Sequence, residues 1–348
     1  MNIKFVGIDL AKNIFQIHGA DEAGHVILRK TVTRAKLLDF VRQLEPAVIG
    51  MEACSTAHYW GRRFVALGHD VRLMPPGYVK PFVKTNKNDQ ADAEAICEAM
   101  QRPTMRFVTI KTPQQQAVLL LHRARTGFVK TRTACANQIR AILSEFGLPI
   151  PIGINHVAER ARLLIEDTSN EIPSICRRLV QSLLEHLAQL SQRIQGIETE
   201  LTQWHRQDET STRIAEIPGV GLLGATAIAA SVGNATQFRN GRQLAAWMGL
   251  VPRQHSSGAK QRLLGISKHG DAYLRTLLIH GARSVLSRLK MKPEALDCWA
   301  VSLLTRRSMN LAATALANKM ARTIWALIRH ERRYSPDFQP MRPISSTA

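Results

Sequence analysis

Acidic residues are scarce in this sequence. Asp and Glu together number 27 against 47 Lys and Arg, which gives a formal net charge of +20 and a pI of about 10.4. An excess of this size favours a polyanionic partner, with nucleic acid the first candidate. The alternative is a basic surface that only keeps the protein in solution.

Cysteine pairs, long apolar runs and aromatic residues are also lacking. The five Cys include no C-x-x-C pair, and the 12 His form no Cys/His cluster with zinc spacing, so we expect a reduced cytosol and no structural zinc. No apolar run reaches the roughly 18 residues of a membrane span, and the first residues lack the apolar core of a signal peptide. Aromatic residues make up 5% of the chain, which leaves little surface for base stacking.

The first part of the chain alternates between strand and helix patterns. Short apolar runs predict five strands, and apolar residues at helical spacing predict three helices between and after them. The strands are expected at 3–11, 13–21, 25–32, 46–53 and 70–76, and the helices at 33–44, 56–67 and 88–100. This order predicts an α/β domain over residues 1–110.

Helix patterns dominate the rest of the chain. Two long helices, joined by a Pro- and Gly-rich connection at 148–157, predict a helical coiled-coil arm over 111–212. A mainly helical domain is expected over 213–335, followed by a tail at 336–348. Its start resembles a helix-hairpin-helix, in which a turn with Gly219 and Gly221 offers backbone N–H groups to a phosphate. A tight helix-packing turn is the alternative.

Four carboxylates follow the expected sheet. Asp9 ends the first strand, Glu52 ends the central strand, and Asp89 and Asp92 share one face of a later helix. If the two strands are neighbours, all four can meet at one edge, where like charges need cations to neutralise them. Oxygen ligands favour Mg²⁺ or Mn²⁺, and two such ions can clamp a phosphodiester. Each acid alone is more typical of a helix cap or a turn.

A basic stretch lies in the last domain. Between Pro252 and Met291, eight Lys or Arg stand against one acid. The segment is rich in Gly and Ser, so it can approach a phosphate backbone, and a Ser before Gly among cations can attack phosphorus. A flexible loop without chemistry is the alternative. The candidate phosphate ligands are Lys260, Arg262, Lys268 and Arg275.

Six short motifs occur in a fixed order: GIDLAK, GMEA, NKNDQADA, IPGVG, LAAWMGLVPRQHSSG and ISKHGDAYLR. Together they resemble the DEDD transposases of bacterial insertion sequences, the 110/1111 family that includes bridge-RNA-guided recombinases. The resemblance implies a RuvC-like, ribonuclease H-like N-terminal domain in which Asp9, Glu52, Asp89 and Asp92 bind Mg²⁺. It also assigns the nucleophilic serine, which would form a covalent phosphoserine link to DNA, to Ser257 rather than its neighbour Ser256.

The same resemblance implies the partners. These are donor and target DNA, a structured noncoding guide RNA encoded by the element, and further copies of the chain in a dimer to tetramer. The expected location is the bacterial cytoplasm, with association to the nucleoid when the protein is active and no membrane contact.

Two other functions remain open on sequence grounds, and a third is disfavoured. A Holliday-junction endonuclease would use the four acids with water as nucleophile and need no serine. A non-catalytic nucleic-acid-binding protein would tolerate alanine at Asp9 or Asp92. An actin-like ATPase fits VGIDLAKN but would need a second Gly-rich phosphate loop, which the N-terminal half lacks.

Overall fold

A computed structural model describes residues 3–84, 89–257, 260, 262–291 and 298–336. The expected tail at 336–348 lies outside these residues apart from position 336. The chain divides into two compact units. The sheet unit comprises Met1–Gln114 with Val232–Arg239, and the helical unit comprises Gln115–Ser231 with Asn240–Ala348. Each is described here by itself.

The sheet unit is built on five strands in the order β3-β2-β1-β4-β5. β1 pairs antiparallel with β2 and parallel with β4, which makes the sheet mixed. The expectation of an α/β domain whose first and central strands are neighbours is confirmed. The elements are β1 (Phe5–Asp9), β2 (Ile14–Ala20), β3 (Val26–Thr33), α1 (Arg34–Arg42), β4 (Val48–Glu52), α2 (Ala57–Ala66), β5 (Asp70–Met74), α3 (Pro76–Val79), η1 (Lys80–Phe82) and α4 (Asp89–Ala99).

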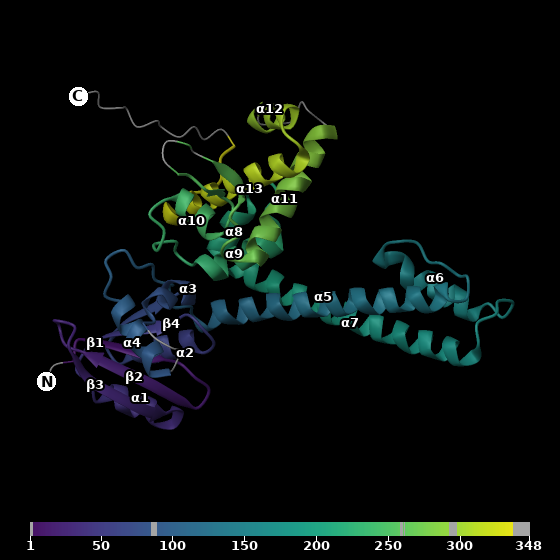
Figure 1. The fold of residues 1–348 in the computed structure, drawn as a ribbon. Coiled ribbons are helices and arrows are strands. Elements are labelled where there is room, and N and C mark those ends of the chain that lie inside the picture. The colour runs from purple at the N-terminus through teal and green to yellow at the C-terminus, as the bar shows by residue number, and fades with distance from the viewer. Residues whose placement is uncertain (1–2, 85–88, 258–259, 261, 292–297, 337–348) are drawn as a thin grey trace. The chain divides into compact units, whose positions relative to one another are not determined.

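The two faces of the sheet bury different partners (Figure 1). Side chains alternate between the faces of a strand, so Val6 and Ile8 of β1 join one core with α1 and α2, centred on Phe15, Trp60 and Phe64. The opposite face packs against α4, whose Ile96 and Cys97 are buried together with Met100, the residue after the helix. The next residues along β1, Gly7 and Asp9, therefore belong to the α4 face.

The helical unit begins with two long helices that lie side by side (Figure 1). α5 and α7 share an apolar core with α6, and the Arg125 guanidinium on α5 donates to Glu198 on α7 at 2.6 and 2.8 Å. The elements are α5 (Pro113–Ser144), α6 (Ile154–Glu166), α7 (Ser174–Gln207), α8 (Glu209–Ala215), α9 (Leu222–Val232), α10 (Gly241–Trp247), β6 (Pro252–Gln254), β7 (Leu263–Ile266), α11 (Ala272–Met291), α12 (Cys298–Arg306) and α13 (Met309–Arg329).

The sequence did not predict two elements, the helix α6 and the hairpin β6–β7. The assignment of 148–157 as a connection is wrong at its end, because α6 starts at Ile154 and buries Val157 and Ala161 against the long helices. The prolines and Gly153 break only the chain before it. The basic stretch carries a two-stranded hairpin, β6–β7, whose strands are too short and exposed to give an alternating pattern. No helix in the described residues is long and apolar enough to cross a membrane.

Candidate active site and nucleic-acid interface

Two of the four predicted acids are neighbours at one edge of the sheet. β1 and β4 pair in register from Phe5 opposite Val48 to Ile8 opposite Met51, so Asp9 and Glu52 follow as the next pair. Both side chains are half-buried. Glu52 lies two residues after Gly50, which pairs with Gly7, and alternation therefore puts both carboxylates on the α4 face. The fold thus brings Asp9 and Glu52 together at the carboxyl ends of parallel strands.

The helix α4 carries the other two acids towards the same edge. It packs directly on glycine: a Cβ on Gly7 would lie 2.7 Å from Cys97 N and would also collide with the carbonyl of Ala93. Cys97 Sγ lies 3.9 Å from Phe5 O, so α4 runs antiparallel to β1. Its first turn therefore extends towards the strand end at which Asp9 lies. Asp92 is half-buried in that turn.

The helix begins at Asp89, whose side chain lies outside the described set. Among the side chains that are described, no group of three or more His, Cys, Asp or Glu is arranged to hold a metal ion. The described part of the edge is therefore an adjacent carboxylate pair with Asp92 on the helix above it.

The Cys54 thiol lies close enough to this pair to be affected by its charge. Burial raises the pKa of Cys54, and the negative charges of Glu52 and Asp9 raise it further. Cys54 lies two residues after the end of β4, and its thiol donates weakly to Ser55 O at 3.5 Å. The carboxylates thus create a negative potential at an accessible position, which a bound cation would relieve.

Two further polar residues share the edge, and sequence reasoning missed them. Gln16 pairs with Asp9 across β1 and β2, and Thr31 pairs with Gln16 across β2 and β3. Directly opposed residues share a face, so the cross-strand row runs Thr31, Gln16, Asp9, Glu52. The Thr31 hydroxyl donates to Gln16 Oε1 at 2.9 Å. Only the antiparallel register reveals this row, because nothing in the local sequence around Gln16 marks it.

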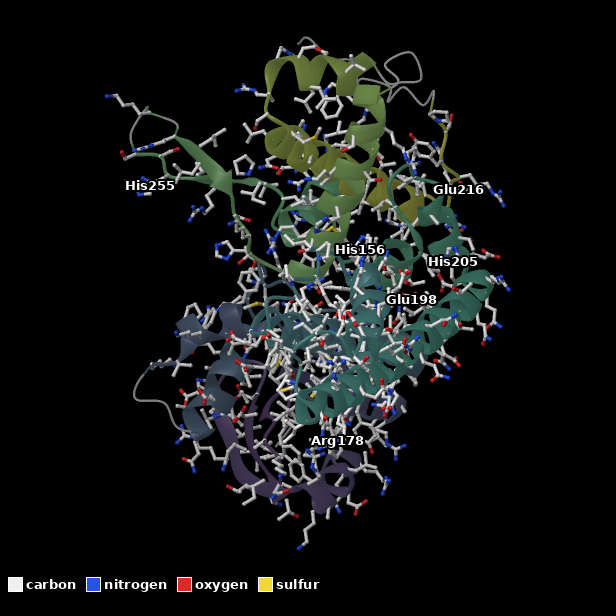
Figure 2. The ribbon with its side chains drawn as sticks, turned by 90° about the vertical axis from the view of Figure 1, so that its right-hand side faces the viewer. His156, Arg178, Glu198, His205, Glu216 and His255 are labelled. Carbon is white, nitrogen blue, oxygen red and sulfur yellow. The ribbon has the colours of Figure 1, made fainter. Side chains whose placement is uncertain are left out.

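The candidate serine lies at the end of the β6–β7 hairpin, where the labelled His255 extends away from the helices of its unit (Figure 2). The Ser256 hydroxyl holds the hairpin: it accepts from Gln254 Nε2 at 3.0 Å and from Arg262 N at 3.4 Å. Ser257 forms a bridge with Lys260 through its backbone carbonyl, 3.3 Å from Lys260 N, and its side chain is exposed.

The four candidate phosphate ligands differ in their surroundings. Lys260 and Arg262 are exposed on the hairpin. Lys268 occupies the left-handed region with a φ of 56° and donates its N–H to Gly249 O at 3.2 Å. Arg275 is half-buried, and its Nη1 donates to Met248 O at 3.1 Å, so it supports the turn before the hairpin.

The two candidate glycines also differ in how closely other atoms surround them. Gly219 has a φ of 88°, and a Cβ there would lie 2.6 Å from the Met320 side chain and 2.7 Å from Gly281 O. It is thus a packing position against α11 and α13. Gly221 is exposed, with no atom within 4 Å of an added Cβ.

Two family models match the chain. Residues 6–147 match a transposase model of the DEDD type named for IS110, and residues 211–297 match the "Transposase IS116/IS110/IS902 family". A probable family 20 transposase from Pseudomonas aeruginosa is 48% identical over 97% of this chain and 100% of its own length. The transposase of IS1111A from Coxiella burnetii is 44% identical over 96% of this chain and 92% of its own. The transposase of IS1328 from Yersinia enterocolitica is 43% identical over 94% and 97%.

These similarities span both units and define a class, the transposases of insertion sequences, enzymes whose substrate is DNA. Within that class the chain belongs to the IS116/IS110/IS902 family. The resemblance drawn from the six motifs is confirmed.

Proposed function

We propose that this transposase is RNA-guided and that it cleaves and rejoins DNA through a covalent phosphoserine on Ser257. In this proposal a RuvC-like domain supplies Asp9, Glu52, Asp89 and Asp92 as the acidic site. The observation that carries it is the adjacency of Asp9 and Glu52 at the carboxyl edge of the sheet, in a chain of transposase family.

The acidic residues fit a hard divalent cation, Mg²⁺ or Mn²⁺. Their donors are carboxylate oxygens, which these ions prefer. Asp9 and Glu52 are neighbours across β1 and β4, and like charges so placed are unfavourable unless a cation neutralises them. When bound, such an ion would offset the charge of a DNA phosphate. Asp9 and Glu52 would hold it from the strands, and Asp89 and Asp92 from α4.

The serine step exchanges one phosphate ester bond for another, so that the strand can be rejoined. The Ser257 hydroxyl loses its proton as its oxygen attacks phosphorus, the bond to one strand oxygen breaks, and that oxygen leaves as a protonated hydroxyl. A strand hydroxyl then attacks the phosphoserine, and the serine is regenerated. The choice of Ser257 is supported by the Ser256 hydroxyl, which already accepts hydrogen bonds from Gln254 and Arg262 within the hairpin. Lys260, Arg262 and Lys268 would neutralise the phosphate, and Arg275 would support the turn before the hairpin. The turn with Gly219 and Gly221 would offer backbone N–H groups to a phosphate.

The partners follow from the charge and the family. A net charge of +20 supports binding of donor DNA, target DNA and an element-encoded guide RNA. Exchange between two duplexes favours a homo-oligomer, up to a tetramer. We further propose the functional divisions 1–110, 111–212 and 213–335, with the paired α5 and α7 as a coiled-coil arm.

The test is a trapped cleavage reaction. A nicked suicide substrate from the element's junction, incubated with RNA and Mg²⁺, should give an adduct that mass spectrometry maps to Ser257. Ser257→Ala should abolish the adduct, whereas Ser256→Ala, the matched control, should retain it. Asp9→Asn should abolish cleavage and leave DNA binding near normal, because phosphate contacts come mainly from Lys and Arg.

Three outcomes contradict parts of this proposal. Cleavage products without any adduct would favour a Holliday-junction-type endonuclease that uses water. Full cleavage in EDTA would exclude the metal. Activity that survives Asp9→Asn would leave only a non-catalytic role for the acidic edge.

A further inference from the structure

A polar cavity lies beside the acidic edge, on the same face of the sheet. Its volume is about 260 Å³, and it is enclosed by β2, β3 and the first turns of α4. The polar residues that line it are Gln16, His18, Arg29, Lys30, Thr31, Gln90 and Glu94. The acidic site as proposed does not use any of these residues.

Strand register fixes the position of the cavity relative to Asp9. Gln16 is the direct cross-strand neighbour of Asp9, and Thr31 is the neighbour of Gln16. Adjacent strands lie about 4.8 Å apart, so the cavity begins one strand away from the carboxylate pair and extends over the next. A nucleic-acid strand with one phosphate at the acidic edge would therefore bring a neighbouring group over the cavity.

His18 is the buried polar group of the cavity. It pairs with Gly7 and Arg29 across the sheet, is only 5% exposed, and lines the cavity beneath α4. Within the described residues its ring makes no hydrogen bond or ion pair, so its two nitrogen atoms are left to a ligand or a water molecule in the cavity. Burial lowers the pKa of His18, so the ring is neutral at pH 7 and offers one donor and one acceptor.

The charged groups of the cavity are already paired. Glu94 lies 3.6 Å from Arg29 and 3.3 Å from Lys84, so a phosphate at this position would have to displace a carboxylate from its cations. Lys30 pairs with Ile17, which belongs to the core on the opposite face of the sheet, and Lys30 Nζ lies 5.0 Å from the centroid of the Phe40 ring. The remaining polar groups that face the cavity are neutral. Gln16 Oε1 accepts from Thr31, which leaves the Gln16 amide N–H₂ group to donate. The cavity is also slightly smaller than the roughly 300 Å³ at which drug-sized sites begin.

We propose that this cavity takes an unpaired base of the DNA strand held at the acidic edge, with His18, Gln16 and Thr31 reading its hydrogen-bonding edge. The ligand class follows from the neutral donors and acceptors, the size, and the position one strand away from Asp9. Enzymes that act on DNA hold unstacked bases through this kind of contact. The strand assignment rests on the proposed function, whereas binding of a base in the cavity does not require cleavage.

The experiment is photocrosslinking of the full chain to single-stranded DNA in which 5-iodouracil replaces thymine. It is performed with Ser257→Ala in Mg²⁺, so that the cation can offset the charge of the phosphate at the acidic edge while the strand stays uncleaved, and the adducts are mapped by mass spectrometry. We expect an adduct within 16–18, 29–31 or 90–94. Thr31→Ile removes an exposed hydroxyl and narrows the cavity. Isoleucine is favoured in strands, so β3 should form as before. It should reduce this adduct roughly fivefold, as expected from the loss of about one hydrogen bond.

The matched control is Thr33→Ile, on the same strand and face but outside the cavity lining. It should leave the adduct unchanged, and thermal unfolding should show that both variants fold. Adducts confined to other parts of the chain would overturn the proposal, as would bound DNA with no adduct in the cavity. An adduct formed with 5-iodouridine RNA but not with DNA would overturn the assignment to the DNA strand. If the unsubstituted chain forms the cavity adduct but does not cleave DNA in Mg²⁺, that result counts against the proposed function alone.

Discussion

A buried histidine in the helical unit should make stability strongly dependent on pH. His122 on α5 is 2% exposed, and burial lowers the pKa of its ring to about 4, with the nearby charge of Arg125 contributing. The Thr226 hydroxyl donates to Leu222 O at 2.7 Å, so it accepts from His122 Nε2–H at 3.0 Å. His122 Nδ1 is then the acceptor for the Tyr273 hydroxyl at 2.9 Å. The neutral ring thus links α5, α9 and α11.

The size of the effect follows from proton linkage. An unfolded histidine has a pKa near 6.5, so between about pH 6.5 and 4 the unfolded chain binds a proton that folded His122 rejects. The stabilisation is complete above the unfolded pKa and is lost as the pH falls. A shift of about 2.5 units corresponds to roughly 3 kcal/mol of unfolding free energy, a large part of the ~5–15 kcal/mol typical of a domain.

Two measurements check this prediction. Carbon-13 NMR of histidine labelled at Cε1, with the His122 signal assigned by its loss in His122→Gln, should show a ring that stays neutral down to about pH 4.5. Urea unfolding of the chain and of His122→Gln between pH 4.5 and 7.5 should give a difference that shrinks as the pH falls. The control is His280→Gln, on the exposed side of α11, which should leave the pH dependence of stability unchanged. A His122 pKa of 6 or higher would refute the reasoning.

Three further predictions concern the acidic edge and the glycines. Mg²⁺ should speed alkylation of the Cys54 thiol, because a cation lowers the raised pKa of this thiol. Glu52→Gln should speed the reaction without metal, and equal rates for the parent, the parent with Mg²⁺ and Glu52→Gln would contradict the charge argument. Gly219→Ala should lower the free energy of unfolding by about 2 kcal/mol or more in urea, because the alanine is strained at positive φ and collides with α11. Gly221→Ala, the control, should lower it much less. Gly7→Ala should separate α4 from the sheet and lower the melting temperature, as thermal unfolding would show, and a melting point equal to the parent's would exclude the close packing inferred for this helix.

Local sequence determined much of the sheet unit. Alternating apolar residues predict all five strands to within a few residues, because each strand buries one or both faces. The same short runs end in Asp9 and Glu52, and the later helix starts at Asp89, so the acids could be chosen before any fold was known. The six motifs likewise identified the family without structural information.

Only tertiary structure decided which of these residues meet. The register of β2 against β1 and β3 puts Gln16 and Thr31 in a row with Asp9, and register depends on pairing partners that are distant in sequence. The close approach of α4 to the sheet depends on Gly7, where a Cβ would meet the backbone of Ala93 and Cys97, and on Gly50, where it would meet the Met100 side chain. Phosphate binding by Gly219 stays a prediction, but its close packing against α11 and α13 could not be read from the sequence. His122 has no sequence signal, since its partners Thr226 and Tyr273 lie 104 and 151 residues away and only folding desolvates the ring.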